Sequence, residues 1–141
     1  MALFAREVDD PELPRGDRGR GSFDDYRYDL RAKNRRVTMT LAGSDPCQEE
    51  LARILEAGGE LETAMSPRSI EQERVDARIE VRLFTGSRVS APVGRIPRGL
   101  ESVIDETLRR LDDRGVKPRI PARIVSRGGA LRVQLLMGAI A

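Results

Sequence analysis

The chain has 141 residues, enough for one domain with a buried core and too few for two ordinary domains. It contains one cysteine and no histidine, which excludes an internal disulfide, a cysteine-built zinc site and a histidine-dependent catalytic triad, so we expect no metal and no cofactor. No apolar run approaches the roughly 20 residues of a membrane helix and no signal peptide is visible, so we expect a cytoplasmic protein without membrane contact.

The formal net charge of +2 is unevenly distributed along the chain. Residues 66–141 hold 15 Lys or Arg against 9 Asp or Glu, whereas residues 1–65 hold 10 against 14. A basic domain behind an acidic front is compatible with nucleic-acid binding. Almost all the basic residues are arginine, a bias that GC-rich coding would also produce, so charge alone does not decide the question.

Residues 1–34 have the composition of a tail, with prolines, glycines and dense mixed charge but no apolar period. We expect this tail to be disordered or docked, and residues 35–141 to form a single domain. Three of the five aromatic residues lie in one segment of the tail, residues 23–28, at Phe23, Tyr26 and Tyr28. They are expected to pack on the chain's own domain or to dock on a neighbouring chain, and base stacking is a third use for them.

Residues 36–41 alternate in polarity and predict a strand. A helix is predicted after it, from Asp45 as N-cap through Pro46 at the first helical position, with Gln48 completing a pattern like a capping box. Cys47 falls on the apolar side of this helix and is expected in the core. Two glycines end the helix at position 58.

Residues 60–65 and 77–84 alternate and predict two more strands, joined by a polar connection over residues 66–73. A turn at Gly86 and a short strand over residues 93–96 then lead into the best helix of the chain.

This second long helix has an apolar face at positions i, i+3, i+4, i+7, i+8 and i+11. Its members are Leu100, Val103, Ile104, Thr107, Leu108 and Leu111. Charged residues cover the other face, including Glu101 and the neighbouring carboxylates Asp105 and Glu106, which are expected in solvent. Gly115 is expected to end the helix.

Residues 117–126 and 131–135 predict two final strands around a hairpin turn at Gly128 and Gly129. Pro118 and Pro121 suggest an edge or a bulge, because proline donates no ladder hydrogen bond. Short alternating strands with two helices favour an α+β fold, as a small, mostly antiparallel β-barrel or curved sheet of the OB type.

Arginines on strand faces are the main functional signal. Arg78 and Arg82 share one side of their predicted strand, and Arg119, Arg123 and Arg132 lie on the two final predicted strands. Arg95 and Arg98 flank the start of the second helix, where the helix dipole favours anions. Such a surface would hold phosphates without reading bases. The alternative is that these arginines pair with Glu60, Glu62 and Glu80. Because the chain offers no general base and no phosphate-loop motif, we do not expect an enzyme.

The segment Val93-Gly94-Arg95-Ile96-Pro97-Arg98-Gly99-Leu100 resembles the strand, turn and helix signature of the HIRAN domain. The resemblance covers about residues 36–137 and implies a small OB-like barrel, found alone in bacteria and phages or fused to helicase-type and nuclease proteins, that grips the 3′ end of single-stranded DNA. Of the family's Tyr-Asp-x-Asn signature only Asp76 is present, since Val75 and Arg78 occupy the tyrosine and asparagine positions.

These observations predict a non-enzymatic domain that binds the phosphates or an end of single-stranded DNA. The residues expected to contact DNA are Arg78, Arg82, Arg95, Arg98, Arg123 and Asp76. A helicase or nuclease, or a second copy of the chain, is the expected protein partner. The alternative is a structural or assembly protein of phage origin whose aromatic tail docks on a neighbouring chain.

Overall fold

The computed structural model describes residues 12–140 and has an α+β fold with one mostly antiparallel sheet. The seven strands are β1 (Met39–Thr40), β2 (Leu61–Ala64), β3 (Glu80–Thr85), β4 (Arg88–Val89), β5 (Gly94–Arg95), β6 (Pro121–Arg127) and β7 (Ala130–Leu135). The α-helices are α1 (Gln48–Ala57), α2 (Ile70–Arg74) and α3 (Glu101–Asp113). Single 3-10 turns are η2 (Arg15–Asp17), η3 (Phe23–Asp25), η4 (Asp45–Cys47) and η5 (Met137–Ala139).

The strand order is β1-β7-β6-β2-β3-β4, with β5 paired to β3. The sheet is open, because β1 and β5 approach each other only through an isolated bridge between Ala42 and Arg95, whose two backbone hydrogen bonds are both 2.8 Å long. Of the two architectures that the sequence predicts, the curved sheet is therefore the one that forms, and the closed barrel is not.

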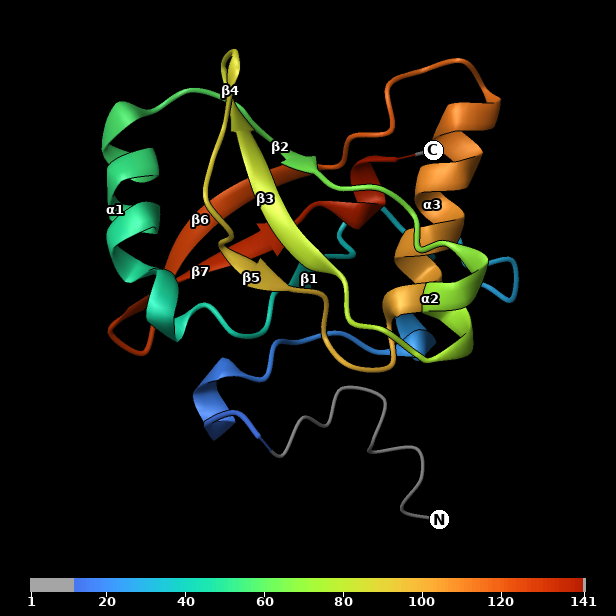
Figure 1. Ribbon diagram of the computed structural model, residues 1–141, viewed down its shortest axis with the longest axis horizontal. Helices are drawn as coiled ribbons and strands as arrows, with labels where there is room; N and C mark the ends of the chain where they lie inside the picture. The colour runs from blue at the N-terminus through green and yellow to red at the C-terminus, as the bar shows by residue number, and fades with distance from the viewer. Residues whose placement is uncertain (1–11, 141) are drawn as a thin grey trace.

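The two long helices lie at opposite ends of the curved sheet (Figure 1). The predicted apolar face of α3 is confirmed, since all six of its members are buried. Four of the six belong to the same core as strand residues such as Val81, Leu83 and Val133; the four are Leu100, Val103, Ile104 and Leu108. None of the described helices is long and apolar enough to cross a membrane.

The other face of α3 differs from the prediction. Glu101 was expected on the charged face and Asp105 in solvent, but the two residues are 2% and 1% exposed. The cause is the connection over residues 66–76, which packs on this face and contains the short helix α2, where the sequence predicted only a polar loop. A capping box between Ser69 and Gln72 starts α2, with hydrogen bonds of 3.1 and 2.8 Å.

The start of α1 also differs from the prediction. Asp45 and Pro46 belong to the 3-10 turn η4, and α1 proper begins at Gln48. The amide of Gln48 does not close a capping box; it donates to the backbone oxygens of Ser44 and Leu131 and accepts from the Leu131 N–H. It therefore ties the helix start to β7.

The β6–β7 hairpin turns at Gly128 and Gly129 as predicted, with φ angles of +60° and +81° that favour glycine. The expectation of an edge strand here is wrong, because β6 lies between β7 and β2. Pro121 is tolerated because it is the first residue of β6.

The expected tail contains a well-packed segment. Residues 12–34 lie on the domain, with Asp17 and Tyr26 both buried and an isolated bridge between Arg20 and Thr40 that extends the sheet beyond β1. This is the own-domain docking that the sequence left open as one alternative. Residues 1–11 of the expected tail lie outside the described residues.

Candidate nucleic-acid interface

The residues expected to contact DNA are divided between two regions of the fold. Arg78, Arg95, Arg98 and Asp76 lie around β5 and the start of α3, Arg82 lies on β3, and Arg123 lies on β6, on the other side of β2. The structure therefore does not gather all six into one surface.

The arginines at the start of α3 are held by a buried carboxylate. Glu101 lies 3.3 Å from Arg98 Nη1 and 3.3 Å from Arg78 Nε. The other carboxylate oxygen of Glu101 accepts from the backbone N–H of Gly99 at 2.8 Å. This N–H, just before the start of α3, is therefore not available to an external anion. The anion site that the sequence predicts at this helix start is filled by the protein's own glutamate.

The network continues to Asp105 and Asp76. Asp105 accepts from the backbone N–H of Arg68 at 2.7 Å and from its Nε at 2.9 Å. Burial lowers the pKa of Arg68, but the hydrogen bond and charge of Asp105, together with the hydrogen bond of Asp76 and the charge of Glu101, outweigh this effect and leave the pKa raised. Asp76, at a positive φ of +53°, lies 3.2 Å from Arg98 and 3.4 Å from Arg68.

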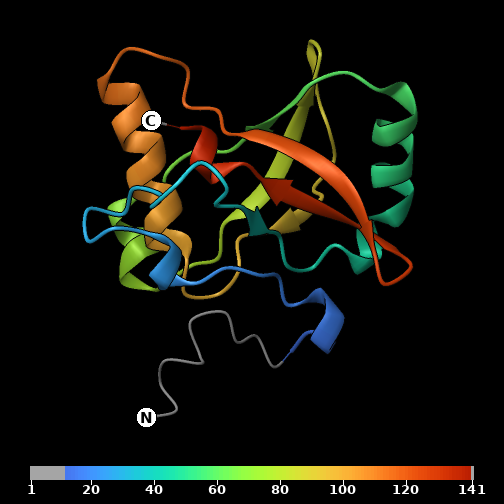
Figure 2. The same ribbon diagram turned by 180° about the vertical axis from the view of Figure 1, so that it is seen from behind.

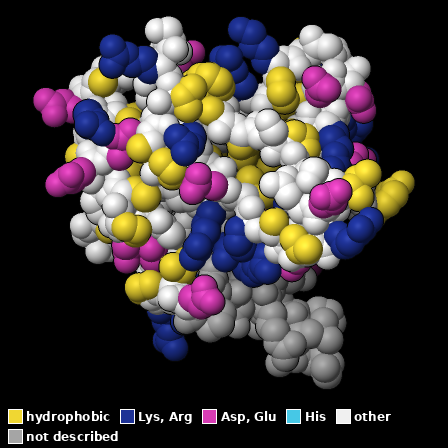
Figure 3. All heavy atoms as spheres, in the orientation of Figure 1, with side chains coloured by type: hydrophobic (Ala, Val, Ile, Leu, Met, Phe, Trp, Pro, Cys, Tyr) yellow, Lys and Arg dark blue, Asp and Glu magenta, His cyan; other side chains and the backbone are white. Residues whose placement is uncertain are grey.

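This network balances three arginines against three carboxylates, so it offers little net charge to a phosphate. Its members are Arg68, Arg78, Arg98, Asp76, Glu101 and Asp105. Figure 3 shows basic and acidic side chains interspersed over the face of β3 and β5. On β3, Arg82 lies 3.7 Å from Glu80. Arg119, which precedes β6, lies 3.5 Å from Glu62 of β2 and 3.8 Å from the ring of Phe84 of β3. Internal pairing therefore holds for these arginines, but only two of the three expected partners, Glu62 and Glu80, take part. No ion pair of Glu60 is found among the described residues, and the other partners are Glu101 and Asp76.

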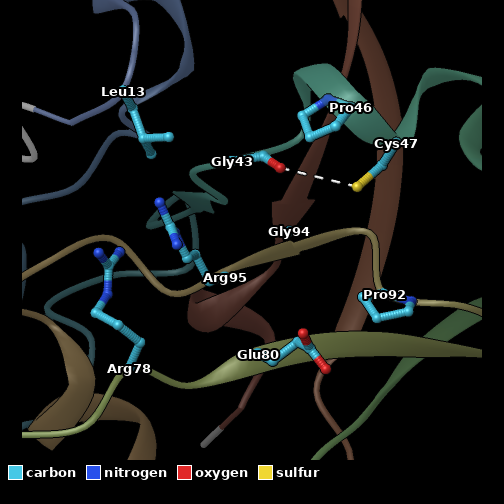
Figure 4. Close-up of a pocket in the computed structure, with 9 residues that line it drawn as sticks. All are labelled: Leu13, Gly43, Pro46, Cys47, Arg78, Glu80, Pro92, Gly94 and Arg95. Carbon is cyan, nitrogen blue, oxygen red and sulfur yellow. Dashed lines mark hydrogen bonds between the residues drawn. The ribbon is translucent and has the colours of Figure 1, made fainter.

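Arg95 and Arg78 line a pocket of about 360 Å³ on this side of the molecule. Their guanidinium groups lie on one side of the pocket, and Pro46, Cys47 and Pro92 lie on the other (Figure 4). Burial raises the pKa of the Cys47 thiol, and the charges of Asp17 and Glu80 raise it further. The thiol is thus stabilised in its neutral form and is a poor nucleophile at neutral pH.

The C-terminal hairpin, formed by β6 and β7, differs from the region around β5 and α3 in its charge, because it has no acidic residue. No Asp or Glu follows Asp113 in the sequence, while Arg123, Arg127 and Arg132 all lie in β6 or β7. The strand register places Arg123 of β6 opposite Gln134 of β7, and Gln134 opposite Thr40 of β1. The isolated bridge between Thr40 and Arg20 adds Arg20 to this row of residues across the sheet. Because partners across a sheet project to the same side, this row and Arg127 share the outer face of β6, β7 and β1.

We call this surface the hairpin face and define it by Arg15, Arg20, Arg123, Arg127 and Arg132. Figure 2 shows the hairpin running across this side of the molecule, with the N-terminal segment beneath its turn. Arg123 donates to the neutral Gln134 at 2.9 Å. Among the described residues, the side chains of Arg15, Arg20 and Arg127 have no ion-pair or hydrogen-bond partner. Three arginines on this face are therefore available to an external anion.

A buried ion pair attaches the N-terminal segment to this face. Arg132 Nη1 donates to Asp17 at 2.6 Å and its Nη2 lies 2.8 Å from Asp45. Asp17 also accepts from the backbone N–H groups of Ser44 and Asp45, at 2.7 and 3.1 Å. These contacts make Arg132 a buried residue, although the sequence places it on an outward row, and they bring Arg15 and Arg20 beside the hairpin.

The aromatic residues expected to dock on a partner are only partly available. Tyr26 is 4% exposed and belongs to the core, and Phe23 packs against that core. Tyr28 alone projects into solvent, with 99% of its surface exposed.

Arg15, Arg20 and Arg127 are not among the residues that the sequence predicts to contact DNA. The absence of acidic residues after Asp113 was a signal that pointed to Arg127. No sequence pattern pointed to Arg15 and Arg20, because only the Asp17–Arg132 pair brings them to the sheet.

Comparisons of the chain with protein-family models, with curated proteins and with solved structures found no match. The resemblance to the HIRAN domain stays a prediction. The apolar residues of the segment that carries it, Val93, Ile96 and Leu100, are all fully buried, so packing accounts for them.

Proposed function

We propose that the protein binds single-stranded nucleic acid, DNA in the first place, without catalysis, and that the hairpin face is the binding surface. The observation that carries this proposal is the imbalance of charge on that face. It holds five arginines, and among residues 12–140 the only carboxylates paired with them are Asp17 and Asp45. Arginine suits this role because its planar guanidinium group bonds two phosphate oxygens at once.

The spacing of the arginines suits an extended strand. Arg123 and Arg127 are four residues apart on β6, which corresponds to about 13 Å, and Arg20 lies three strand spacings from Arg123, about 14 Å. A strand of nucleic acid crossing the face would meet one guanidinium group every few phosphates.

The outward residues of β6 and β7 include no aromatic side chain. Without a ring for base stacking, the contacts would be made with the sugar-phosphate backbone. We therefore expect binding that is independent of base sequence and strongly dependent on salt.

Fluorescence anisotropy with an internally labelled oligodeoxynucleotide across a salt series tests the proposal. Three available arginines predict a slope of log affinity against log salt of about −2, since each phosphate contact on a single strand contributes about −0.7. The variant Arg123→Glu/Arg127→Glu should weaken binding at least tenfold and reduce the slope.

The matched comparator is Arg82→Glu/Arg88→Glu, which changes the same number of charges on β3 and β4, at the other end of the strand order. It should leave binding within about threefold of the unmodified chain. Equal weakening by both double variants, or no binding at low salt, would contradict the proposal. In the second case an assembly protein that docks through Tyr28 is the better account.

A further inference from the structure

A pocket of about 270 Å³ opens on the hairpin face, between the N-terminal segment and the β6–β7 turn. Four arginines line it, Arg15, Arg20, Arg127 and Arg132, together with Thr40 and the backbone of three glycines. No carboxylate of the described residues belongs to its lining. Arg15 and Arg20 come from residues 15–20 and the other two from the hairpin, so the pocket exists only where these segments meet.

We propose that this arginine pocket binds a phosphate monoester, the terminal phosphate of a nucleic-acid strand. The inference rests on the proposed function and specifies which part of the strand the hairpin face holds most tightly.

The charge of the pocket favours a doubly charged group. Four arginines, less the two carboxylates that hold Arg132, leave a net charge of +2. A phosphate monoester has a second pKa near 6 and is therefore close to −2 at neutral pH, whereas a diester within a strand carries −1. The Coulomb attraction to the same cations is thus nearly twice as large for the terminal group.

The pocket also has a fixed donor and free space. Arg132 is held on two sides by Asp17 and Asp45, so its orientation is set before any ligand arrives. Glycine occupies positions 16 and 128 of the lining, and a Cβ at Gly16 would meet no atom closer than the 4.0 Å of an Arg132 nitrogen. A terminal phosphate enters such a concavity with one attached chain, whereas an internal diester needs room for two.

The test measures anisotropy of the full chain with three forms of one internally labelled 12-nucleotide strand: with a 5′-phosphate, with a 3′-phosphate, or with hydroxyls at both ends. One phosphorylated form should bind about tenfold more tightly than the dihydroxyl form. Gly16→Glu places a carboxylate in the pocket without removing an arginine, and it should abolish this preference while the dihydroxyl strand still binds. Gly16→Ala is the matched control and should retain the preference.

Equal binding of all three strands overturns the pocket proposal and leaves the proposed function standing. A second arm measures the thermal stability of the unmodified chain and of Gly16→Glu with a deoxynucleoside 5′-monophosphate or with the matching nucleoside. If no strand binds but the monophosphate alone stabilises the unmodified chain, the proposed function falls and a free mononucleotide is the source of the phosphate. If neither strand nor monophosphate binds, both proposals fall.

Discussion

The carboxylate of Asp17 connects the N-terminal segment to the sheet and to the start of η4. It is 1% exposed and makes three hydrogen bonds, to Arg132 at 2.6 Å and to the backbone N–H groups of Ser44 and Asp45 at 2.7 and 3.1 Å. Replacing Asp17 with alanine removes the two oxygens that accept all three hydrogen bonds. Because no residue of the segment replaces them, the attachment of residues 12–20 should weaken together with the domain.

The size of the loss follows from the groups left behind. A buried donor without an acceptor costs about 1–3 kcal/mol, and breaking one side of a buried ion pair costs about 3–5 kcal/mol. These figures overlap at Arg132, which also keeps Asp45 as a partner. We therefore expect Asp17→Ala to lower the free energy of unfolding by about 3–5 kcal/mol, a large part of the 5–15 kcal/mol typical of a domain.

Urea unfolding followed by far-ultraviolet circular dichroism at pH 7 measures this loss. Asp17→Asn keeps one acceptor oxygen and should lose about half as much. Asp24→Ala changes an exposed aspartate of the same segment and should stay within about 0.5 kcal/mol of the unmodified chain. Limited trypsin digestion should also cut Asp17→Ala faster at Arg15 and Arg20. A loss below about 1 kcal/mol for Asp17→Ala, with no change in digestion, would refute the assigned role of this carboxylate.

Three further predictions concern the core and the network beside α3. Glu101→Gln should lower the free energy of unfolding by about 2–4 kcal/mol in urea, because it leaves two partly buried arginines facing a neutral partner; an unchanged midpoint would contradict the network. Burial, then the charge of Asp25, raises the pKa of Tyr26 above its ordinary value of 10.0, so stability should be lost as pH rises above about 10. Tyr26→Phe should reduce that loss without weakening the fold at pH 7, since the hydroxyl has no hydrogen-bond partner in the described structure; identical pH profiles would count against it. Gly94→Ala should destabilise the domain by about 2 kcal/mol or more, because its φ is +153° and a Cβ would lie 2.8 Å from a backbone oxygen; a melting temperature equal to that of the unmodified chain would exclude this strain.

Part of the candidate site could be predicted from the sequence. The alternation over residues 117–135 placed Arg123 on an outward face, where the structure has it. The alternation over residues 77–84 gave Arg78 and Arg82 an outward face, but it contained no information about Glu101, which belongs to another element and binds Arg78. An arginine is available to a ligand only when no carboxylate reaches it, and that condition depends on contacts between distant segments.

The sequence by itself determined the α+β class, the apolar face of α3, the β6–β7 hairpin and the glycines that end the helices. These features depend on the period of apolar residues and on local backbone preferences, which neighbours in the chain are enough to specify. Only the tertiary structure decided that the sheet stays open, that Glu101 and Asp105 are buried, and that residues 12–34 belong to the domain. Each of these outcomes depends on partners many residues apart, such as Asp17 with Arg132 and Arg68 with Asp105. Ion pairs between distant residues produce no periodic pattern in the sequence. The sequence does not distinguish a charged residue that is solvated by water from one that is paired with a buried partner.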